Sequence, residues 1–364
     1  MTERVFGTAL LLPKDNIAAA ETRDLGPAPS LDEGQALFAV ERVALTANNV
    51  TYAAMGERMG YWRFFPGPAG FGILPVWGYA RCVSSEADGI SKGDRFYGYW
   101  PLAEQLLVET EQVTAAGFND PSEHRDGLAD IYNRYNRRDD EPDPATEAIE
   151  ALHRPLFATG WLLARQLGRA QDYGAEQVLI SSASSKTAIA CAWTYAQRTE
   201  DEHRPEVIGL TSAANTDFVR GLGLYDRVYT YENLFEIADD RATIYNDFAG
   251  TVPFRRQVHE RFGPRLNRSV AIGLTHWQET GPGEDVPPPE SKLFFAPDAI
   301  SDEIQTYGRS GYVKENEAAW DAFSTWVTPH TEVHAVVGLD EAALAYRDLA
   351  AGRIAGAAGL IVTP

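Results

Sequence analysis

The chain has 364 residues, of which 44% are hydrophobic and 23% charged, so it is long enough for two globular domains with a sizeable core. Its formal net charge of -20 opposes binding to nucleic acid and to anionic membranes, because such binding usually needs a basic face. The two cysteines, Cys82 and Cys191, are too few for a disulfide framework or a four-cysteine zinc site, and they suit a reducing cytoplasm.

The N-terminal residues carry one short apolar run and no small-residue cleavage pattern. No later stretch reaches the roughly 18 to 20 apolar residues that a membrane span requires. We therefore expect a cytoplasmic protein that has neither a membrane nor a nucleic acid as its partner.

The first 115 residues predict an antiparallel, barrel-like segment, because short β-like runs alternate with turns. These runs cover residues 36–45, 76–83, 95–99 and 105–109. Residues 119–150 differ, since they are dense in charge and proline, and they predict an exposed insertion or long connection. The acidic run at 139–143 is typical of a solvated surface.

From about residue 151, predicted strands alternate with predicted helices. A helix at 157–167 is followed by a strand at 177–181, a helix ending at 198, a strand at 206–211 and a helix at 215–221. Further strands are predicted at 227–231, 243–248 and 269–273, and the segment 290–308 can supply another strand and a helix. After residue 331 come a strand, a helix at 339–351 and a strand at 359–363. This alternation is typical of a doubly wound parallel sheet.

Several passages spread over most of the chain carry a family resemblance. They are ALTANNVTYAAMG (44–56), GISKGDRFYGYWPLAEQLLVETEQV (89–113), GLGLYDRVYTYENL (221–234), IYNDFAGTV (244–252) and the closing residues 339–364. They resemble the medium-chain dehydrogenase/reductase superfamily on its zinc-free quinone-reductase and enoyl-reductase side. The nearest likeness is to a bacterial group known only as a domain of unknown function.

The resemblance implies an α/β fold with two domains. A GroES-like antiparallel barrel domain would comprise residues 1–150 and 318–364, with 119–150 as its exposed insertion or connection. A doubly wound Rossmann dinucleotide-binding domain would comprise residues 151–317. Zinc-dependent members of the superfamily carry a Gly-His-Glu stretch, whereas the comparable LPVWGYARCV (74–83) has Tyr79 and no histidine. We therefore expect no catalytic zinc.

The stretch SSASSKTA (181–188) stands where a dinucleotide-binding turn would carry glycines. Small residues remain at the same spacing, namely Ser182, Ser185 and Ala188. A phosphate would lie at the helix N-terminus, with Lys186 and the hydroxyls of Ser184, Ser185 and Thr187 as donors. The alternative is a polar helix cap without a ligand, because serine and threonine are preferred caps. An ATP-binding loop is disfavoured because Ile180 stands where its first glycine would be.

The ends of the predicted parallel strands supply further candidates for binding a cofactor. The strand at 206–211 ends in Thr211 and Ser212, with Asn215 following and no acid before Asp217, which favours NADPH over NADH. An ordinary polar turn is the alternative. The later strands end in polar or small residues at Asp247, Gly273 and Thr275.

Zinc-free hydride transfer to an activated carbon needs a proton donor and a hydrogen bond to the developing oxyanion. In the segment that resembles the family's active-site floor, and in the aromatic loop after it, the candidate catalytic residues are Asn48, Asn49, Tyr52 and Tyr61. The wall of an apolar pocket would come from Trp62, Phe64, Phe65, Phe71 and Trp77. Core packing or a dimer contact is the alternative for any single one of these aromatic residues.

Together these features predict an NADPH-dependent, zinc-independent reductase of a small α,β-unsaturated carbonyl or quinone-like substrate with an apolar body. The alternative is a non-catalytic binding or scaffold protein of the same fold with a degenerate cofactor loop. The resemblance also implies a homodimer, because the superfamily commonly pairs its nucleotide domains edge to edge. The apolar strand at 291–296 would otherwise leave an exposed edge.

Overall fold

The computed structural model describes residues 4–138, 143–199, 201–272 and 286–364, which form two compact units. The first unit comprises Met1–Leu152, Glu332–Ile354 and Ala358–Pro364, and the second comprises His153–Thr331 and Ala355–Ala357. Residues 318–331, expected in the first domain, belong to the second unit, because they continue the long helix α7 (Ala296–Val327) and the short turn after it.

The first unit is built on a largely antiparallel sheet whose main path runs β2-β1-β7-β3-β5-β6-β10-β9-β8. Strand β4 joins it through β1, and β18 joins it through β3 and pairs with β17 in parallel. The strands are β1 (Val5–Pro13), β2 (Glu21–Asp24), β3 (Gln35–Leu45), β4 (Phe71–Ile73), β5 (Pro75–Ser85), β6 (Arg95–Pro101), β7 (Ala103–Glu109), β8 (Glu111–Thr114), β9 (Gly117–Asn119), β10 (Arg134–Arg138), β17 (Glu332–Val337) and β18 (Ala358–Thr363). The helices of this unit are α1 (Ala47–Ala54), α2 (Tyr61–Phe64) and α8 (Leu339–Ala350).

Aromatic residues fill the core of this sheet. Every residue of β6, with the sequence RFYGYWP, is buried, so this strand lies in the interior on both faces. The ring of Phe38 lies 5.5 Å from Phe96 and 5.6 Å from Phe118. Aromatic pairs with such geometry stabilise the folded state by more than the burial of their surface area alone.

The segment 119–150 is not the exposed insertion that we expected. Strand β10 pairs with both β6 and β9, and Tyr135 at its centre is fully buried 4.5 Å from the ring of Trp100. The buried Arg125 forms an ion pair with the buried Asp120 at 3.0 Å. Charge density misled the prediction because some of these charges, such as the Asp120–Arg125 pair, are neutralised inside the fold, whereas Glu123, Asp126 and Asp130 are exposed. Residues 139–142 of the acidic run lie outside the described residues, and Asp143 caps helix α3 (Pro144–Arg169).

The second unit contains a six-stranded parallel sheet in the order β13-β12-β11-β14-β15-β16. Its strands are β11 (Gln177–Ile180), β12 (Glu206–Thr211), β13 (Arg227–Thr230), β14 (Thr243–Asp247), β15 (Leu266–Ala271) and β16 (Lys292–Leu293). This order, 3-2-1-4-5-6 counted along the chain, is that of the predicted Rossmann fold, and it reverses direction between β11 and β14.

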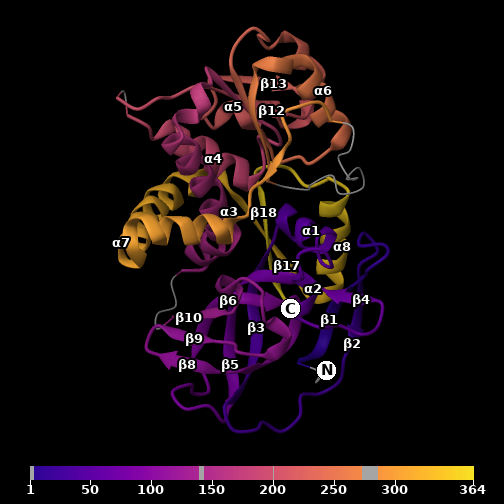
Figure 1. Ribbon diagram of the computed structural model, residues 1–364. Helices are drawn as coiled ribbons and strands as arrows, with labels where there is room; N and C mark the ends of the chain where they lie inside the picture. The colour runs from indigo at the N-terminus through magenta and orange to yellow at the C-terminus, as the bar shows by residue number, and fades with distance from the viewer. Residues whose placement is uncertain (1–3, 139–142, 200, 273–285) are drawn as a thin grey trace. The chain divides into compact units, whose positions relative to one another are not determined.

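Figure 1 shows helices α4 (Lys186–Ala196) and α5 (Thr216–Gly221) on one side of the parallel sheet and α6 (Val252–Phe262) on the other. The central strands are apolar and buried on both faces, as β11 with QVLI illustrates. No helix in the described parts of the chain is both long enough and apolar enough to cross a membrane.

Candidate functional site

The turn between β11 and α4 contains no glycine, yet it places one residue in the left-handed region and caps the helix that follows. Ser182 has a φ of +50°, in the left-handed region where glycine is the usual residue. The amide of Ser185 donates to the carbonyl of Ser182 at 2.7 Å, and the Ser185 hydroxyl caps the helix by accepting from the amide of Ala188 at 3.4 Å. Ala188 is fully buried, so the helix packs closely on the strand, as the spacing predicted.

Side chains from neighbouring strands hold this turn in place. The hydroxyl of the buried Ser181 donates to Asp247 at 3.0 Å and accepts from the amide of Phe248 at 2.9 Å. The hydroxyl of Tyr231 accepts from the amide of Ser182 at 2.9 Å. The turn is therefore held by side chains from the end of β14 and from the segment that follows β13.

Asp247, which we predicted to bind the cofactor, has partners within the protein at both carboxylate oxygens. It is fully buried, and its Oδ1 accepts hydrogen bonds from Ser181, Tyr245 and the amide of Gly250 at 2.9 to 3.0 Å. Its Oδ2 pairs with Arg255 at 2.7 Å. Both oxygens thus have the partners that a buried carboxylate requires. Through Ser181, Asp247 stabilises the start of the turn.

The end of β12 places polar groups beside this turn. Thr211 is buried, whereas Ser212 and Asn215 are partly exposed and linked by a hydrogen bond of 3.2 Å from Asn215 Nδ2 to Ser212 Oγ. The next acid, Asp217, lies exposed on α5. The other two predicted cofactor residues, Gly273 and Thr275, lie outside the described residues.

Lys186 and Thr187 form the first turn of α4, whose backbone N–H groups have no acceptor within the helix. Lys186 is half-buried, and burial lowers the pKa of its ammonium group to about 8. Burial, together with the positive charge of Lys186, lowers the pKa of the buried His153 well below its ordinary value. Because the pKa of Lys186 lies above neutral pH, its side chain carries a positive charge at the N-terminal end of α4 near neutral pH.

In the first unit, four tyrosines and one tryptophan form a cluster that we call the phenol nest. Its members are Tyr52 on α1, Tyr61 on α2, Trp77 on β5, Tyr99 on β6 and Tyr132 at the end of the 3₁₀ helix η2 (Asp130–Tyr132). The ring of Tyr52 lies 4.7 Å from that of Tyr61, and the ring of Tyr99 lies 4.7 Å from that of Tyr132. All four tyrosines are buried.

Burial raises the pKa of all four phenols in the nest. They therefore stay protonated and can donate hydrogen bonds. Trp77 donates its indole N–H to the Tyr52 hydroxyl at 3.1 Å, and the hydroxyls of Tyr61 and Tyr132 lie 3.5 Å apart. Within the described part of the chain the fully buried Tyr99 hydroxyl has no hydrogen-bond partner.

The remaining predicted catalytic residues lie close to the nest but differ in role. Asn48, on α1, lies within hydrogen-bonding reach of Tyr52. Asn49 is buried, accepts from the amide of Thr46 at 2.6 Å and donates to the carbonyl of Pro75 at 2.8 Å. Asn49 therefore fixes the N-terminus of α1 to β5, and its hydrogen-bonding groups are used for that purpose.

The predicted aromatic wall divides into two groups. Phe64 and Phe65 pack on Tyr99 at 5.4 and 5.8 Å, beside the nest. Trp62 lies against Gly56 and Gly72, and Phe71 stacks under Arg23. Sequence reasoning missed Tyr99 and Tyr132. The two tyrosines at alternate positions of RFYGYWP could have suggested Tyr99. Tyr132, in contrast, belongs to the segment that we expected to be exposed.

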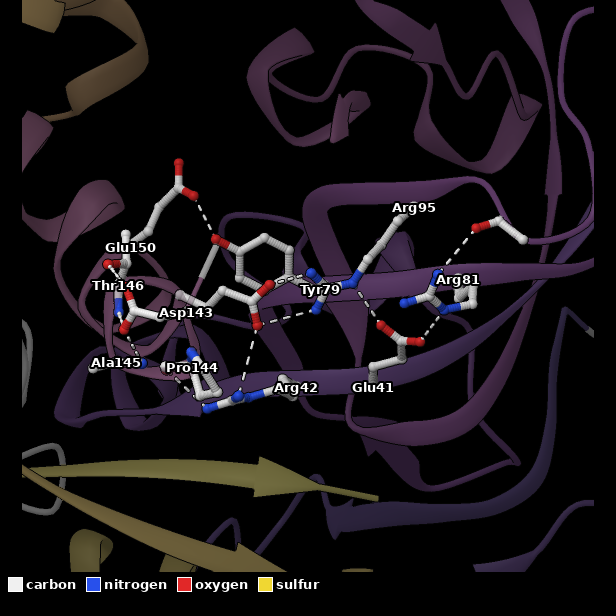
Figure 2. A network of polar contacts seen from close by, with 12 residues as sticks. Glu41, Arg42, Tyr79, Arg81, Arg95, Asp143, Pro144, Ala145, Thr146 and Glu150 are labelled. Carbon is white, nitrogen blue, oxygen red and sulfur yellow. Dashed lines mark hydrogen bonds and ion pairs between the residues drawn. The ribbon is translucent and has the colours of Figure 1, made fainter. Parts of the chain in front are cut away.

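A partly buried network of ion pairs surrounds Tyr79, in the segment that we compared with the Gly-His-Glu stretch of zinc-dependent superfamily members (Figure 2). Tyr79 is fully buried and donates to Glu150. Arg95 bridges Glu147 and Glu41, at 2.7 Å from the latter. The described residues contain no group of three His, Cys, Asp or Glu side chains that could hold a metal ion.

Comparison with known proteins identifies the family and confirms the fold. The model of a family described as "Protein of unknown function (DUF2855)" matches residues 43–355. No curated protein sequence matches the chain.

Among solved structures, CurA from Vibrio vulnificus in complex with NADPH aligns with a TM-score of 0.63 at 13% identity, over 98% of this chain and 99% of CurA. The quinone oxidoreductase from Coxiella burnetii gives 0.54 at 14%, over 98% and 99% of the two chains. The CurK enoyl reductase gives 0.54 at 15%, over 98% of each chain. These alignments confirm the predicted fold, in which a GroES-like barrel is paired with a Rossmann domain.

Proposed function

The chain belongs to the DUF2855 family, and for this member we propose a zinc-independent reductase that uses NADPH. Its substrate would be an α,β-unsaturated carbonyl or quinone-like molecule with an apolar body. The observation that carries the proposal is the turn at 181–188, which keeps a left-handed residue at Ser182, a capped helix N-terminus and a buried Ala188. These features suit a bound pyrophosphate.

The preference for NADPH is supported by the chemistry at the end of β12. Ser212 and Asn215 are hydrogen-bond donors that suit a 2′-phosphate, and no acid precedes the exposed Asp217. A structurally similar protein, CurA, was crystallised with NADPH. Lys186 would supply the local positive charge that an anionic cofactor requires in a chain with a net charge of -20.

The phenol nest would serve the acceptor end of the reaction. NADPH, when bound, supplies a hydride. Tyr52 and its neighbours would donate hydrogen bonds to the carbonyl oxygen of the substrate as negative charge develops on it. Their raised pKa values keep these phenols neutral, and the surrounding rings exclude water, which strengthens each hydrogen bond.

Zinc independence is part of the proposal. Tyr79 lies in the segment comparable to the Gly-His-Glu stretch of zinc-dependent superfamily members, and its hydroxyl donates a hydrogen bond to Glu150. Elemental analysis of protein purified without chelators should find no stoichiometric zinc. One zinc per chain would contradict this part of the proposal.

The proposed function is tested by titrating the purified protein with NADPH and NADH while following nicotinamide fluorescence. We expect saturable binding with NADPH at least about tenfold tighter, a difference of about 1.4 kcal/mol. NADPH oxidation should then be followed with a panel of quinones and enones. Equal affinity would contradict the cofactor preference, and binding without turnover would contradict the reductase.

One observation favours a second candidate, a scaffold protein that has lost its cofactor. The amide of Ser182, a natural donor to phosphate, is already held by Tyr231 at 2.9 Å. A turn satisfied by its own protein can persist without a ligand. If neither nicotinamide cofactor binds, the scaffold function is the one to retain.

A further inference from the structure

A short segment near the C-terminus returns to the nucleotide-binding unit. Residues Ala355–Ala357 belong to the second unit, although the chain on either side of them belongs to the first. The amide of Gly356 donates to Oδ1 of Asn215 at 3.4 Å. We call these three residues the strap.

The backbone of the strap lies directly on the turn at 181–188, which we call the phosphate turn. A Cβ atom built on Gly356 would lie 2.7 Å from Cβ of Ser184 and 3.1 Å from the ring of Phe218. Real Cβ atoms essentially never approach other atoms below 3.0 Å, so only glycine lets the strap lie this close. The strap therefore spans from the phosphate turn to the segment that follows β12.

Three hydrogen-bond donors from distant parts of the sequence meet at this place. They are the hydroxyl of Ser212, Nδ2 of Asn215 and the amide of Gly356. At present Asn215 Nδ2 donates to Oγ of Ser212 at 3.2 Å, and the Gly356 amide donates to Oδ1 of Asn215 at 3.4 Å. Both bonds exceed the usual length of about 2.9 to 3.0 Å. Long mutual bonds are readily exchanged for shorter bonds to an anion, because hydrogen bonds to charged acceptors are stronger.

We propose that the strap forms one wall of the adenosine pocket and that the Gly356 amide joins Ser212 and Asn215 in binding the 2′-phosphate of NADPH. The inference rests on the proposed function, and it adds a backbone donor that neither residue type nor motif reveals. An amide donor suits this acidic chain, since it brings hydrogen bonding without requiring a further cation. Glycine at 356 is required because any side chain would lift the strap off Ser184.

Adenosine 2′,5′-bisphosphate and adenosine 5′-monophosphate are the probes for calorimetric titration, since they differ only in the 2′-phosphate. Gly356→Ala should weaken the bisphosphate about tenfold or more and change the monophosphate less than about twofold. The control is Gly221→Ala, because Cβ there would meet no atom within 4 Å. The control should bind both probes as the parent does.

A double-variant cycle tests the contact itself. Ser184→Gly removes the Cβ atom with which the methyl group introduced by Gly356→Ala would clash. Ser184→Gly alone measures the effect of losing the Ser184 hydroxyl. In the Ser184→Gly background, adding Gly356→Ala should cost less than about threefold in bisphosphate affinity, because coupled residues are non-additive. An equal cost in both backgrounds would overturn the assignment of the strap as the pocket wall.

The possible outcomes distinguish a failure of this inference from a failure of the proposed reductase function. If the parent binds NADPH and Gly356→Ala binds the bisphosphate equally well, the inference is wrong and the reductase proposal stands. Equal weakening of both probes would indicate a general distortion and would also overturn the inference. If the parent binds neither NADPH nor the bisphosphate, the inference and the proposed function fail together.

Discussion

Lys186 is the cationic residue of the phosphate turn, and its side chain is half-buried because it lies in the first turn of a packed helix. Lys186→Ala should weaken NADPH by about 1 to 3 kcal/mol through loss of a charge-assisted hydrogen bond. Fluorescence titration at constant ionic strength measures this loss, and Lys186→Arg is the charge-preserving control.

The pH dependence of binding should follow the same side chain. Because burial lowers the pKa of Lys186 to about 8, its positive charge is present below that pH and is lost as the pH rises through it. NADPH affinity should therefore fall above about pH 8. In Lys186→Arg this alkaline fall should disappear, because arginine stays charged. A parent affinity that stays flat across the alkaline range would remove Lys186 from the site.

Tyr99 and Tyr135 offer a matched pair of phenylalanine substitutions. The Tyr135 hydroxyl donates to the carbonyl of Tyr99 at 3.0 Å and accepts from Arg125 at 3.2 Å. Tyr135→Phe should thus lower the free energy of unfolding by about 1 to 3 kcal/mol, since buried groups lose a partner. Tyr99→Phe removes a hydroxyl that has no partner among the described residues, so stability should stay equal or rise.

Of these two substitutions, the one that leaves stability intact is the one that we expect to lower catalytic activity. If the nest binds the substrate oxygen, Tyr99→Phe should lower kcat/KM while the protein remains as stable as the parent. Denaturant unfolding and steady-state kinetics on the same preparations make the comparison. Full activity in Tyr99→Phe would assign Tyr99 to the core alone.

At the scale of elements, the contact between α3 and α4 depends on Gly160. A Cβ at this position would lie 2.4 Å from the carbonyl oxygen of Thr187 and 2.7 Å from the amide of Cys191. Gly160→Ala should therefore destabilise the protein by about 1 to 3 kcal/mol, because overpacking at a backbone contact forces the helices apart.

Gly311 in α7 is the matched control, since its added Cβ would make only an ordinary contact of 3.4 Å with Tyr307. Gly311→Ala should stabilise the protein by roughly 0.5 to 1 kcal/mol through helix propensity. Opposite signs in chemical denaturation would support both assignments. A stabilising Gly160→Ala would show that α3 and α4 are less closely packed than described.

The central strands of the parallel sheet, β11, β12 and β14, were predictable because each is a short, largely buried run followed by a helix. Strand 206–211 matches β12 (Glu206–Thr211), and 243–248 is within one residue of β14 (Thr243–Asp247). The region 119–138 was not predictable from composition. Its charges look like those of an exposed segment, and only the three-dimensional pairing of residues such as Asp120 with Arg125 removes them from water.

The candidate site likewise has one part that the sequence predicts and another part that it does not. The serine turn could be predicted because local spacing sets a turn and a helix cap. The role of Asp247 could not, because its donors come from β14 and the loop after it, from the turn after β11 and from α6. Tyr132 and Gly356 likewise depend on contacts with residues far away in sequence, which no local pattern encodes.

At the scale of the whole molecule, we predict a homodimer through the edge of the parallel sheet. Within the described residues β16 (Lys292–Leu293) pairs only with β15, and Leu293 is 60% exposed. An apolar edge strand left open is a template for pairing with another chain. A twofold interface lets two identical edges pair with each other and closes the assembly.

Light scattering should give about twice the monomer mass, and Leu293→Asp should shift the protein toward monomer because the edge would then carry buried, unpaired charge. Leu344→Asp is the control, since Leu344 is 51% exposed on α8, in the other unit. It should leave the mass unchanged, as charge at an isolated exposed position costs little. A parent protein at the monomer mass would refute the dimer, and a dimer insensitive to Leu293→Asp would place its interface elsewhere.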